Sequence, residues 1–281
     1  MERMALATVE AARELFQAFY AVVCTSGTLE PIPAFVQMAG LPEKTVCHTV
    51  PPPYSSENLA AFVCRGVTTS LEKRSMWMFR KIVRRIGEVV RYTPTNVGVF
   101  ASSYEVLEGL LEAGLGEELE KPIFVERRGV SFAECEKMLA EFRSCAERGG
   151  GVLVGVQGGK LSEGTDFPGK EMESVVVVGV PYAQPTKRVK LRVEYYDQLY
   201  PGKGVEYGYI IPAMRKAAQS AGRALRGAED RAVIVFMDYR FSTPYCRRLL
   251  PSWVRKNLVV VEDEDGALAE RVIRFFRENP R

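Results

Sequence analysis

The sequence has little of what metal sites and hydrolytic triads require. Its 281 residues contain one histidine, His48, and six cysteines, none of which form a C-x-x-C pair. Cys47 precedes His48, but no second pair completes a zinc site, and no G-x-S-x-G segment supplies a nucleophile. We therefore interpret the cysteines as scattered reduced thiols and expect neither a metal centre nor a histidine-based triad.

Long hydrophobic runs and a strong net charge are missing as well. Apolar runs such as residues 175–178 are far too short to cross a bilayer, so no membrane partner is expected. Residues 1–4 include an acid and show no signal-peptide pattern, which favours a soluble intracellular protein, cytoplasmic or, in a eukaryote, nuclear. The net charge of +3 is too mild to indicate a nucleic-acid partner, so only local clusters can argue for one.

The composition and the pattern of apolar residues favour a single α/β domain over residues 1–281. Hydrophobic residues make up 47% of the chain and charged residues 26%, which is typical of a globular protein with a buried core. The expected strands cover residues 21–24, 97–100, 122–125, 152–156, 174–180, 232–237 and 258–261. The expected helices cover residues 5–20, 70–91, 104–111, 132–145, 189–199, 209–225 and 267–278.

Short apolar strands that alternate with helices are typical of a mostly parallel sheet buried on both faces. Residues 1–20 would then be a leading helix. The prolines at 51–53 cannot lie in a helix or a central strand, so residues 51–95 are interpreted as a connector and helical decoration. Ligands of such folds bind at the carboxyl ends of the strands, and this rule directs attention to the polar segments that follow them.

Two of these polar segments are short and ambiguous. Residues 25–29 follow the first expected strand and could donate to an anion or simply form a capped turn. Ser102 and Ser103 precede a helix beginning at Tyr104. They could cap that helix, or its free N–H groups could bind a phosphate.

A third segment, residues 158–167, resembles a phosphate-binding loop without being one. The pattern G-x-x-x-x-G-K-[ST] requires a glycine where Val154 stands and a hydroxyl where Leu161 stands. Its glycines and Lys160 could nevertheless approach a nucleic-acid backbone or a nucleotide.

A fourth segment carries two arginines and an amide. On a helix, Gln219, Gly222, Arg223 and Arg226 share one face, and guanidinium groups bind phosphate bidentately. The alternative is a solvated helix with two surface arginines. Glycine inside a helix costs about 1 kcal/mol relative to alanine, which indicates that some contact requires it there.

The order of these segments resembles a known family. TSGTL, VFASSY, GGKLSEGTDF and QSAGRALR are similar to motifs III, IV, V and VI of superfamily-two DNA helicases. The resemblance is to the XPD family, the iron–sulfur helicases of nucleotide-excision repair, and next to their bacterial DinG relatives, and it covers roughly residues 20–260. It implies the second RecA-like (P-loop NTPase-type) motor domain, a three-layer sandwich, in an ATP-dependent helicase that unwinds DNA from 5′ to 3′.

The resemblance also implies roles for individual residues. Arg223 and Arg226 would be arginine fingers for ATP, with Gln219 alongside. Glu163, Gly164, Asp166 and Gly222 would bind the nucleotide and couple it to DNA. The expected DNA contacts are Ser102, Ser103, Tyr104, Lys160, Ser162 and the basic cluster of Lys187, Arg188 and Lys190, for which a plain solvated surface is the alternative.

The sequence departs from the family in what surrounds these motifs. It contains no Walker A loop, no D-E-x-H segment and no cysteine pattern for an iron–sulfur cluster, all of which belong to the first half of an XPD-type protein. ATP and Mg²⁺ would therefore be shared with a first RecA-like domain, and the chain is expected to be a fragment or a split-gene product. Its expected partners are single-stranded DNA, that first domain, and repair or transcription proteins.

Two other classes of function remain open from the sequence. The chain could be a non-catalytic docking module of a repair or transcription assembly. It could instead be a nuclease or a nucleotide sensor of similar fold, although no carboxylate cluster has the spacing of metal ligands that a nuclease needs.

Overall fold

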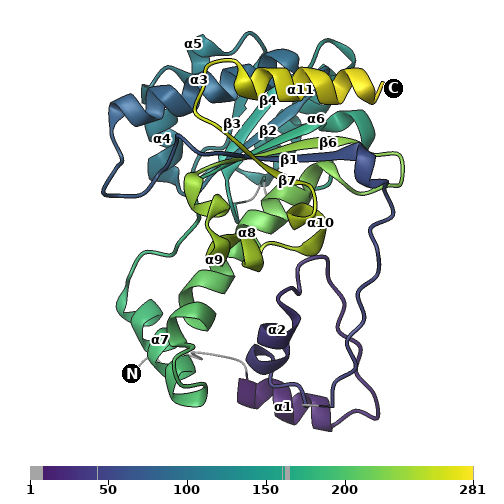
Figure 1. Ribbon diagram of the computed structural model, residues 1–281, viewed down its shortest axis with the longest axis vertical. Helices are drawn as coiled ribbons and strands as arrows, with labels where there is room; N and C mark the ends of the chain where they lie inside the picture. The colour runs from purple at the N-terminus through teal and green to yellow at the C-terminus, as the bar shows by residue number, and fades with distance from the viewer. Residues whose placement is uncertain (1–8, 43, 160, 162–164, 281) are drawn as a thin grey trace.

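A seven-stranded sheet lies in the upper part of the molecule as drawn in Figure 1. The computed structural model describes residues 9–42, 44–159, 161 and 165–280. The strands are β1 (Leu59–Cys64), β2 (Val97–Ala101), β3 (Ile123–Val125), β4 (Val152–Val156), β5 (Ser174–Val178), β6 (Ala232–Met237) and β7 (Leu258–Val261). They lie in the order β3-β4-β2-β5-β6-β1-β7, and every pairing between them is parallel. The expected parallel α/β sheet is confirmed.

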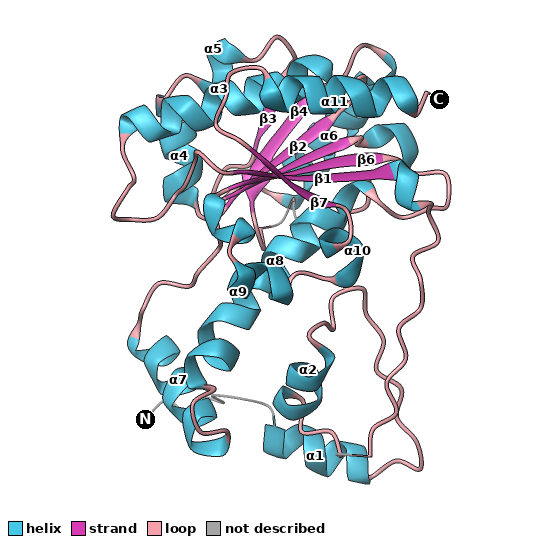
Figure 2. Cartoon of the chain, viewed as in Figure 1, coloured by secondary structure: helices cyan, strands magenta, loops and turns pink. Residues whose placement is uncertain are grey.

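Helices cover both faces of this sheet (Figure 2). The described helices are α1 (Val9–Gln17), α2 (Ile32–Met38), α3 (Met76–Tyr92), α4 (Tyr104–Glu112), α5 (Leu115–Glu118), α6 (Phe132–Ser144), α7 (Lys187–Leu199), α8 (Ile211–Ala221), α9 (Pro244–Leu249), α10 (Ser252–Arg255) and α11 (Ala267–Glu278). Of these, α1, α2 and α7 lie away from the sheet (Figure 2). Side chains of α3, α4 and α11 share one hydrophobic core, and those of α6, α8, α9 and α10 share a second. The result is a three-layer sandwich. Among the described helices, none is long and apolar enough to span a membrane.

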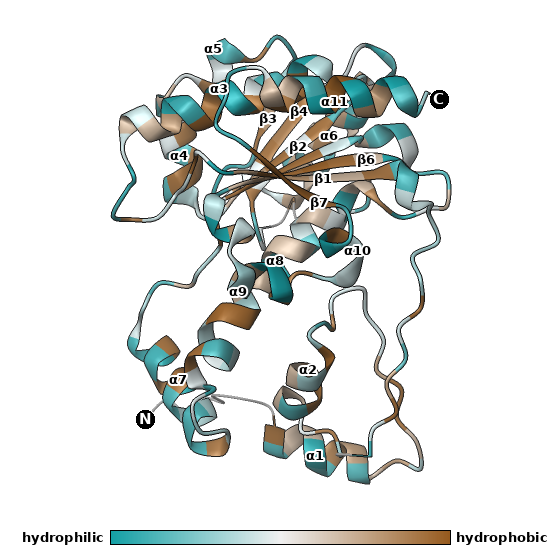
Figure 3. Ribbon diagram, viewed as in Figure 1, coloured by the Kyte–Doolittle hydropathy of each residue, from teal (hydrophilic) through white to brown (hydrophobic). Residues whose placement is uncertain are grey.

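The inner strands are apolar on both faces because each face is covered by a helical layer. All residues of β2, β4, β5 and β6 are buried, and the strands accordingly appear brown in the hydropathy view (Figure 3). Hydroxyl side chains fix where the covering helices begin. The Ser75 hydroxyl accepts a hydrogen bond from the Met78 N–H at 3.2 Å, so α3 begins at Met76 rather than at residue 70.

The structure corrects two elements near the start of the chain. Residues 21–24 were expected to form a strand, but they have no regular structure and are exposed. The strand β1 lies instead inside residues 51–95, which were interpreted as a connector and helical decoration. An apolar run becomes a strand only where a neighbour satisfies its backbone, and β1 is inserted between β6 and β7.

The helix expected at residues 209–225 is also shorter than predicted. A π-helical turn, Glu206–Ile210, precedes α8, and a 3-10 turn, Gly222–Ala224, follows it. Arg226 therefore lies beyond α8, and Gly222 is the C-cap residue of α8 rather than an interior residue. The expected cost of a glycine inside the helix was therefore wrong. No contact requires a glycine here either, since any residue can adopt its φ of −76° and a Cβ would make ordinary 3.7 Å contacts with Trp253.

Candidate nucleotide and nucleic-acid site

The polar segments that follow the strands meet at the carboxyl edge of the sheet. Ser102 and Ser103 come directly after β2, and the Ser103 hydroxyl accepts from the Val106 N–H at 3.2 Å. This is the capping arrangement considered from the sequence. Ser102 donates its backbone N–H to the Val178 carbonyl at 2.8 Å, which joins the end of β2 to the end of β5.

A buried carboxylate organises the neighbouring strand ends. Asp238 follows β6 and is fully buried. Its Oδ2 accepts from the Thr69 N–H at 2.9 Å, and the Arg240 guanidinium donates to both oxygens, at 2.8 Å to Oδ1 and 2.7 Å to Oδ2. Asp238 was not among the predicted site residues. Its signal was the polar residue directly after a buried strand, which is the position that the carboxyl-end rule selects.

Gly179 allows these strand ends to approach closely. It follows β5 with a φ of +79°, a conformation that residues with a Cβ rarely adopt. A Cβ at this position would come within 2.1 Å of the Thr69 Oγ1 and 2.8 Å of the Ser102 Oγ. Three segments, after β1, β2 and β5, are therefore packed together with no room for a side chain between them.

Tyr104 extends this edge toward β3. It is half-buried at the start of α4, and its hydroxyl donates to the Glu126 carboxylate at 3.1 Å. Burial raises the pKa of the Tyr104 hydroxyl, and the negative charge of Glu126 raises it further. The phenol therefore remains a proton donor at neutral pH.

The two arginines of the fourth segment converge on one carboxylate. Arg226 Nη2 lies 2.6 Å from Asp166 Oδ1, and Arg223 Nη1 lies 3.7 Å from the same oxygen. Arg223 also donates to the Thr165 carbonyl at 2.7 Å. Arg223 is 7% exposed, whereas Arg226 and Gln219 are exposed. The structure thus brings together two arginines and the acid of the third segment.

Other residues selected from the sequence are placed differently. Lys160, Ser162, Glu163 and Gly164 lie outside the described residues. Lys187, Arg188 and Lys190 are exposed in the first turn of α7, a helix that lies well away from the sheet in Figure 1. Residues 25–29 form a local turn, in which the Ser26 hydroxyl accepts from the Thr28 N–H at 3.3 Å. The structure does not bring the α7 cluster next to residues 102–104.

The fold defines a class of protein, a RecA-like helicase domain. A solved structure described as XPD helicase superposes on 84% of this chain and 42% of that chain, with a TM-score of 0.65 and 22% sequence identity. A second, described as the apo form of XPD, covers 73% of this chain and 40% of that one with a TM-score of 0.59 and 22% identity. At these identities the similarity establishes the fold.

The sequence comparison then gives the family. A family model described as the helicase C-terminal domain matches residues 86–257, so the chain belongs to that family. Regulator of telomere elongation helicase 1 of Mus musculus is 32% identical over 94% of this chain and 24% of its own length. The general transcription and DNA repair factor IIH helicase subunit XPD of Schizosaccharomyces pombe is 29% identical over 95% of this chain and 37% of its own.

These matches confirm the resemblance to XPD-type superfamily-two helicases and their C-terminal region. The chain spans about a quarter to a third of the length of these two relatives. Among the described residues, no group of three or more histidine, cysteine or acidic side chains is placed to hold a metal ion.

Proposed function

We propose that this chain is the second motor domain of an ATP-dependent 5′ to 3′ DNA helicase, working inside the cell on single-stranded DNA. The observation that supports this most is the convergence of Arg223 and Arg226 on one oxygen of Asp166. Two guanidinium groups that share one carboxylate oxygen are placed to share a phosphate oxygen as well. In the assembled motor that oxygen would belong to ATP, with Mg²⁺ and the phosphate-binding loop supplied by a first RecA-like domain.

The nucleotide step follows from the exposure of these groups. Arg226 is 46% exposed in its side chain, and Asp166 is 62% exposed. An ion pair this open is worth little, so it can exchange for a more highly charged phosphate at small cost. Arg226 would move from Asp166 to the γ-phosphate when the cleft closes. Arg223 would stabilise the charge that develops on the transferring phosphoryl group, with Gln219 beside it.

Coupling to DNA would pass through the same edge of the sheet. Asp166 and Gly222 would bind or sense the nucleotide, and the same role is proposed for Glu163 and Gly164, which lie outside the described residues. Residues 102–104 would contact the DNA backbone, and this role is also proposed for Lys160 and Ser162, which lie outside the described residues too. Release of the arginines from the phosphate after hydrolysis would let them pair with Asp166 again, and this movement would shift the DNA contacts along the strand.

ATP hydrolysis by the chain alone and by the chain mixed with a matching first RecA-like domain tests this function. We expect no turnover from the chain alone, because the sequence contains no G-x-x-x-x-G-K-[ST] loop, and DNA-stimulated turnover from the mixture. Turnover by the chain alone would show that it holds a phosphate site of its own. No ATP turnover in either condition, combined with binding to a repair or transcription protein, would favour the docking module instead.

The α7 basic cluster offers a separate test of DNA binding. We expect the double charge reversal Arg188→Glu and Lys190→Glu to weaken single-stranded DNA binding. The plot of log affinity against log salt concentration should also become less steep, its slope falling in magnitude by about 1.4 for two lost phosphate contacts. Fluorescence anisotropy over a salt series measures both quantities. Arg271→Glu with Arg274→Glu is the matched control, since both arginines are exposed on α11. An affinity and a slope equal to those of the wild type would remove α7 from the DNA path.

A further inference from the structure

A buried glutamate outside the recognised motifs joins two of them. Glu126 directly follows β3 and is 6% exposed. Its Oε2 accepts from the Val156 N–H at 2.9 Å, and its Oε1 accepts from the Tyr104 hydroxyl at 3.1 Å. Val156 ends the strand that leads into residues 158–167, and Tyr104 begins the helix after β2. One carboxylate therefore bonds to the end of the strand that leads into motif V and to the last residue of motif IV.

Two glycines make space for this carboxylate. A Cβ at Gly155 would lie 2.8 Å from Glu126 Oε2, and a Cβ at Gly159 would lie 2.6 Å from Glu126 Oε1. A side chain at either position would displace the carboxylate from the Val156 N–H and the Tyr104 hydroxyl. Neither Gly155 nor Gly159 has a positive φ, so close contacts account for them: the glutamate at Gly155, and the glutamate together with the Val156 carbonyl at Gly159.

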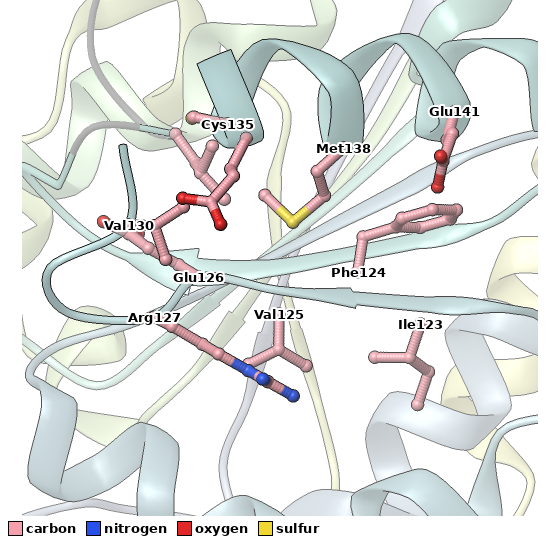
Figure 4. Close-up of a pocket in the computed structure, with 11 residues that line it drawn as sticks. Ile123, Phe124, Val125, Glu126, Arg127, Val130, Cys135, Met138 and Glu141 are labelled. Carbon is pink, nitrogen blue, oxygen red and sulfur yellow. The ribbon is translucent and has the colours of Figure 1, made fainter. Parts of the chain in front are cut away.

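Two further contacts place Tyr104 and Leu161 near Glu126. The Arg128 guanidinium lies 4.4 Å from the centre of the Tyr104 ring, on the segment that follows Glu126. Glu126 and Leu161 line a pocket of about 450 Å³ between β3 and α6, and Figure 4 shows Glu126 at the end of the strand that forms one wall. Leu161 belongs to motif V, so this residue of motif V and the glutamate line the same pocket.

We propose that Glu126 is a positioning residue that fixes the spacing between the DNA-contacting segment, residues 102–104, and the end of β4, which leads into the nucleotide-coupling segment. This deepens the proposed function and rests on it for the roles of the two segments. A displacement of Tyr104 by DNA would reach the end of β4 through two hydrogen bonds. Each of these bonds involves the buried Glu126 side chain, and hydrogen bonds of buried groups are costly to break.

Amide hydrogen exchange in the free chain tests the positioning role without relying on helicase activity. We expect Glu126→Ala to raise exchange about tenfold in peptides covering residues 103–107 and 152–159, because a bond to a charged group is lost in each. Glu126→Gln should stay within about twofold of the wild type, since its amide can accept from Val156 and donate to the Tyr104 oxygen. Glu141→Ala is the matched control, an exposed acid lining the same pocket.

Several results would overturn the proposal. Unchanged amide exchange at residues 152–159 in Glu126→Ala would do so. An equal rise of the exchange rate in β1 would also do so, because it would indicate general destabilisation. Glu126→Gln exchanging as fast as Glu126→Ala would also contradict it. If Glu126→Ala does not fold, Tyr104→Phe removes only the hydroxyl and must still speed exchange at residues 152–159.

A second measurement separates this proposal from the function on which it rests. When an oligothymidylate is added to the wild type, we expect slower amide exchange in both peptides, residues 103–107 and 152–159. In Glu126→Ala we expect slower exchange in residues 103–107 alone. Protection of both segments in Glu126→Ala would overturn the coupling. If the wild-type chain binds no DNA, the proposed DNA contacts fail, while the exchange rates of the free chain still decide whether Glu126 positions the two segments.

Discussion

Replacing Arg223 with alanine is expected to lower ATP turnover by the chain mixed with its first RecA-like domain by about a thousandfold or more. An arginine finger stabilises charge on the transferring phosphoryl group and typically contributes a factor of this size. Arg223 is the buried member of the pair that converges on Asp166, so its guanidinium is held in place before ATP arrives. Steady-state hydrolysis at saturating ATP and DNA measures the loss.

The controls separate chemistry from folding, because Arg223 also donates to the Thr165 carbonyl. Arg223→Lys keeps the charge but loses the planar fork, so we expect it to remain strongly impaired. Arg91→Ala removes an exposed arginine paired with Glu120 at the surface and should retain turnover, as surface pairs contribute little. If Arg223→Ala is folded by thermal unfolding and hydrolyses ATP at the wild-type rate, the arginine-finger assignment is wrong.

Replacing Asp238 with alanine is expected to reduce the free energy of unfolding by about 3–5 kcal/mol, the usual cost of removing one partner from a buried charged pair. The change leaves Arg240 without its carboxylate, and it removes the acceptor of the Thr68 hydroxyl and the Thr69 N–H. Urea unfolding followed by circular dichroism gives this quantity from the midpoint and slope.

Two further variants locate the origin of that loss. Asp238→Asn retains the shape and some of the accepting capacity, so it should be destabilised less than the alanine variant. Glu262→Ala breaks an exposed ion pair with Arg65 and should change the free energy of unfolding by about 1 kcal/mol or less. A loss in Asp238→Ala no larger than in Glu262→Ala would show that the buried network does not hold the strand ends together.

The longer helices and most strands follow from local pattern, whereas the short helices α2, α5, α9 and α10 were not predicted. The strands β2, β4, β6 and β7 were predicted to within a residue or so because each is a short apolar run between polar turns. Residues 21–24 and β1 show where this reasoning ends. Both are short apolar runs, and the run that includes Ala60 and Ala61 carries the weaker strand propensity. Only that second run has β6 and β7 beside it.

The candidate site was predictable in part for the same reason. Arg223 and Arg226 were selected because an arginine pair separated by three residues is a local feature of the sequence. Their meeting with Asp166 joins segments about sixty residues apart, and neither spacing nor the motif resemblance predicted this pairing. Glu126 and Asp238 lie outside the four segments, and nothing in their neighbourhood in the sequence marks them as partners of Tyr104 and Thr69.

The sequence by itself determined the α/β class, the parallel sheet and the residue types at the ends of its strands, since periodicity and side-chain chemistry are local properties. Tertiary structure decided that β1 and not residues 21–24 became a strand, and it decided which polar groups met. Asp238 and Thr69 are separated by 169 positions, and they come together because β1 lies next to β6. Strand order depends on the packing of the whole chain, and that packing places Glu126 between two motifs.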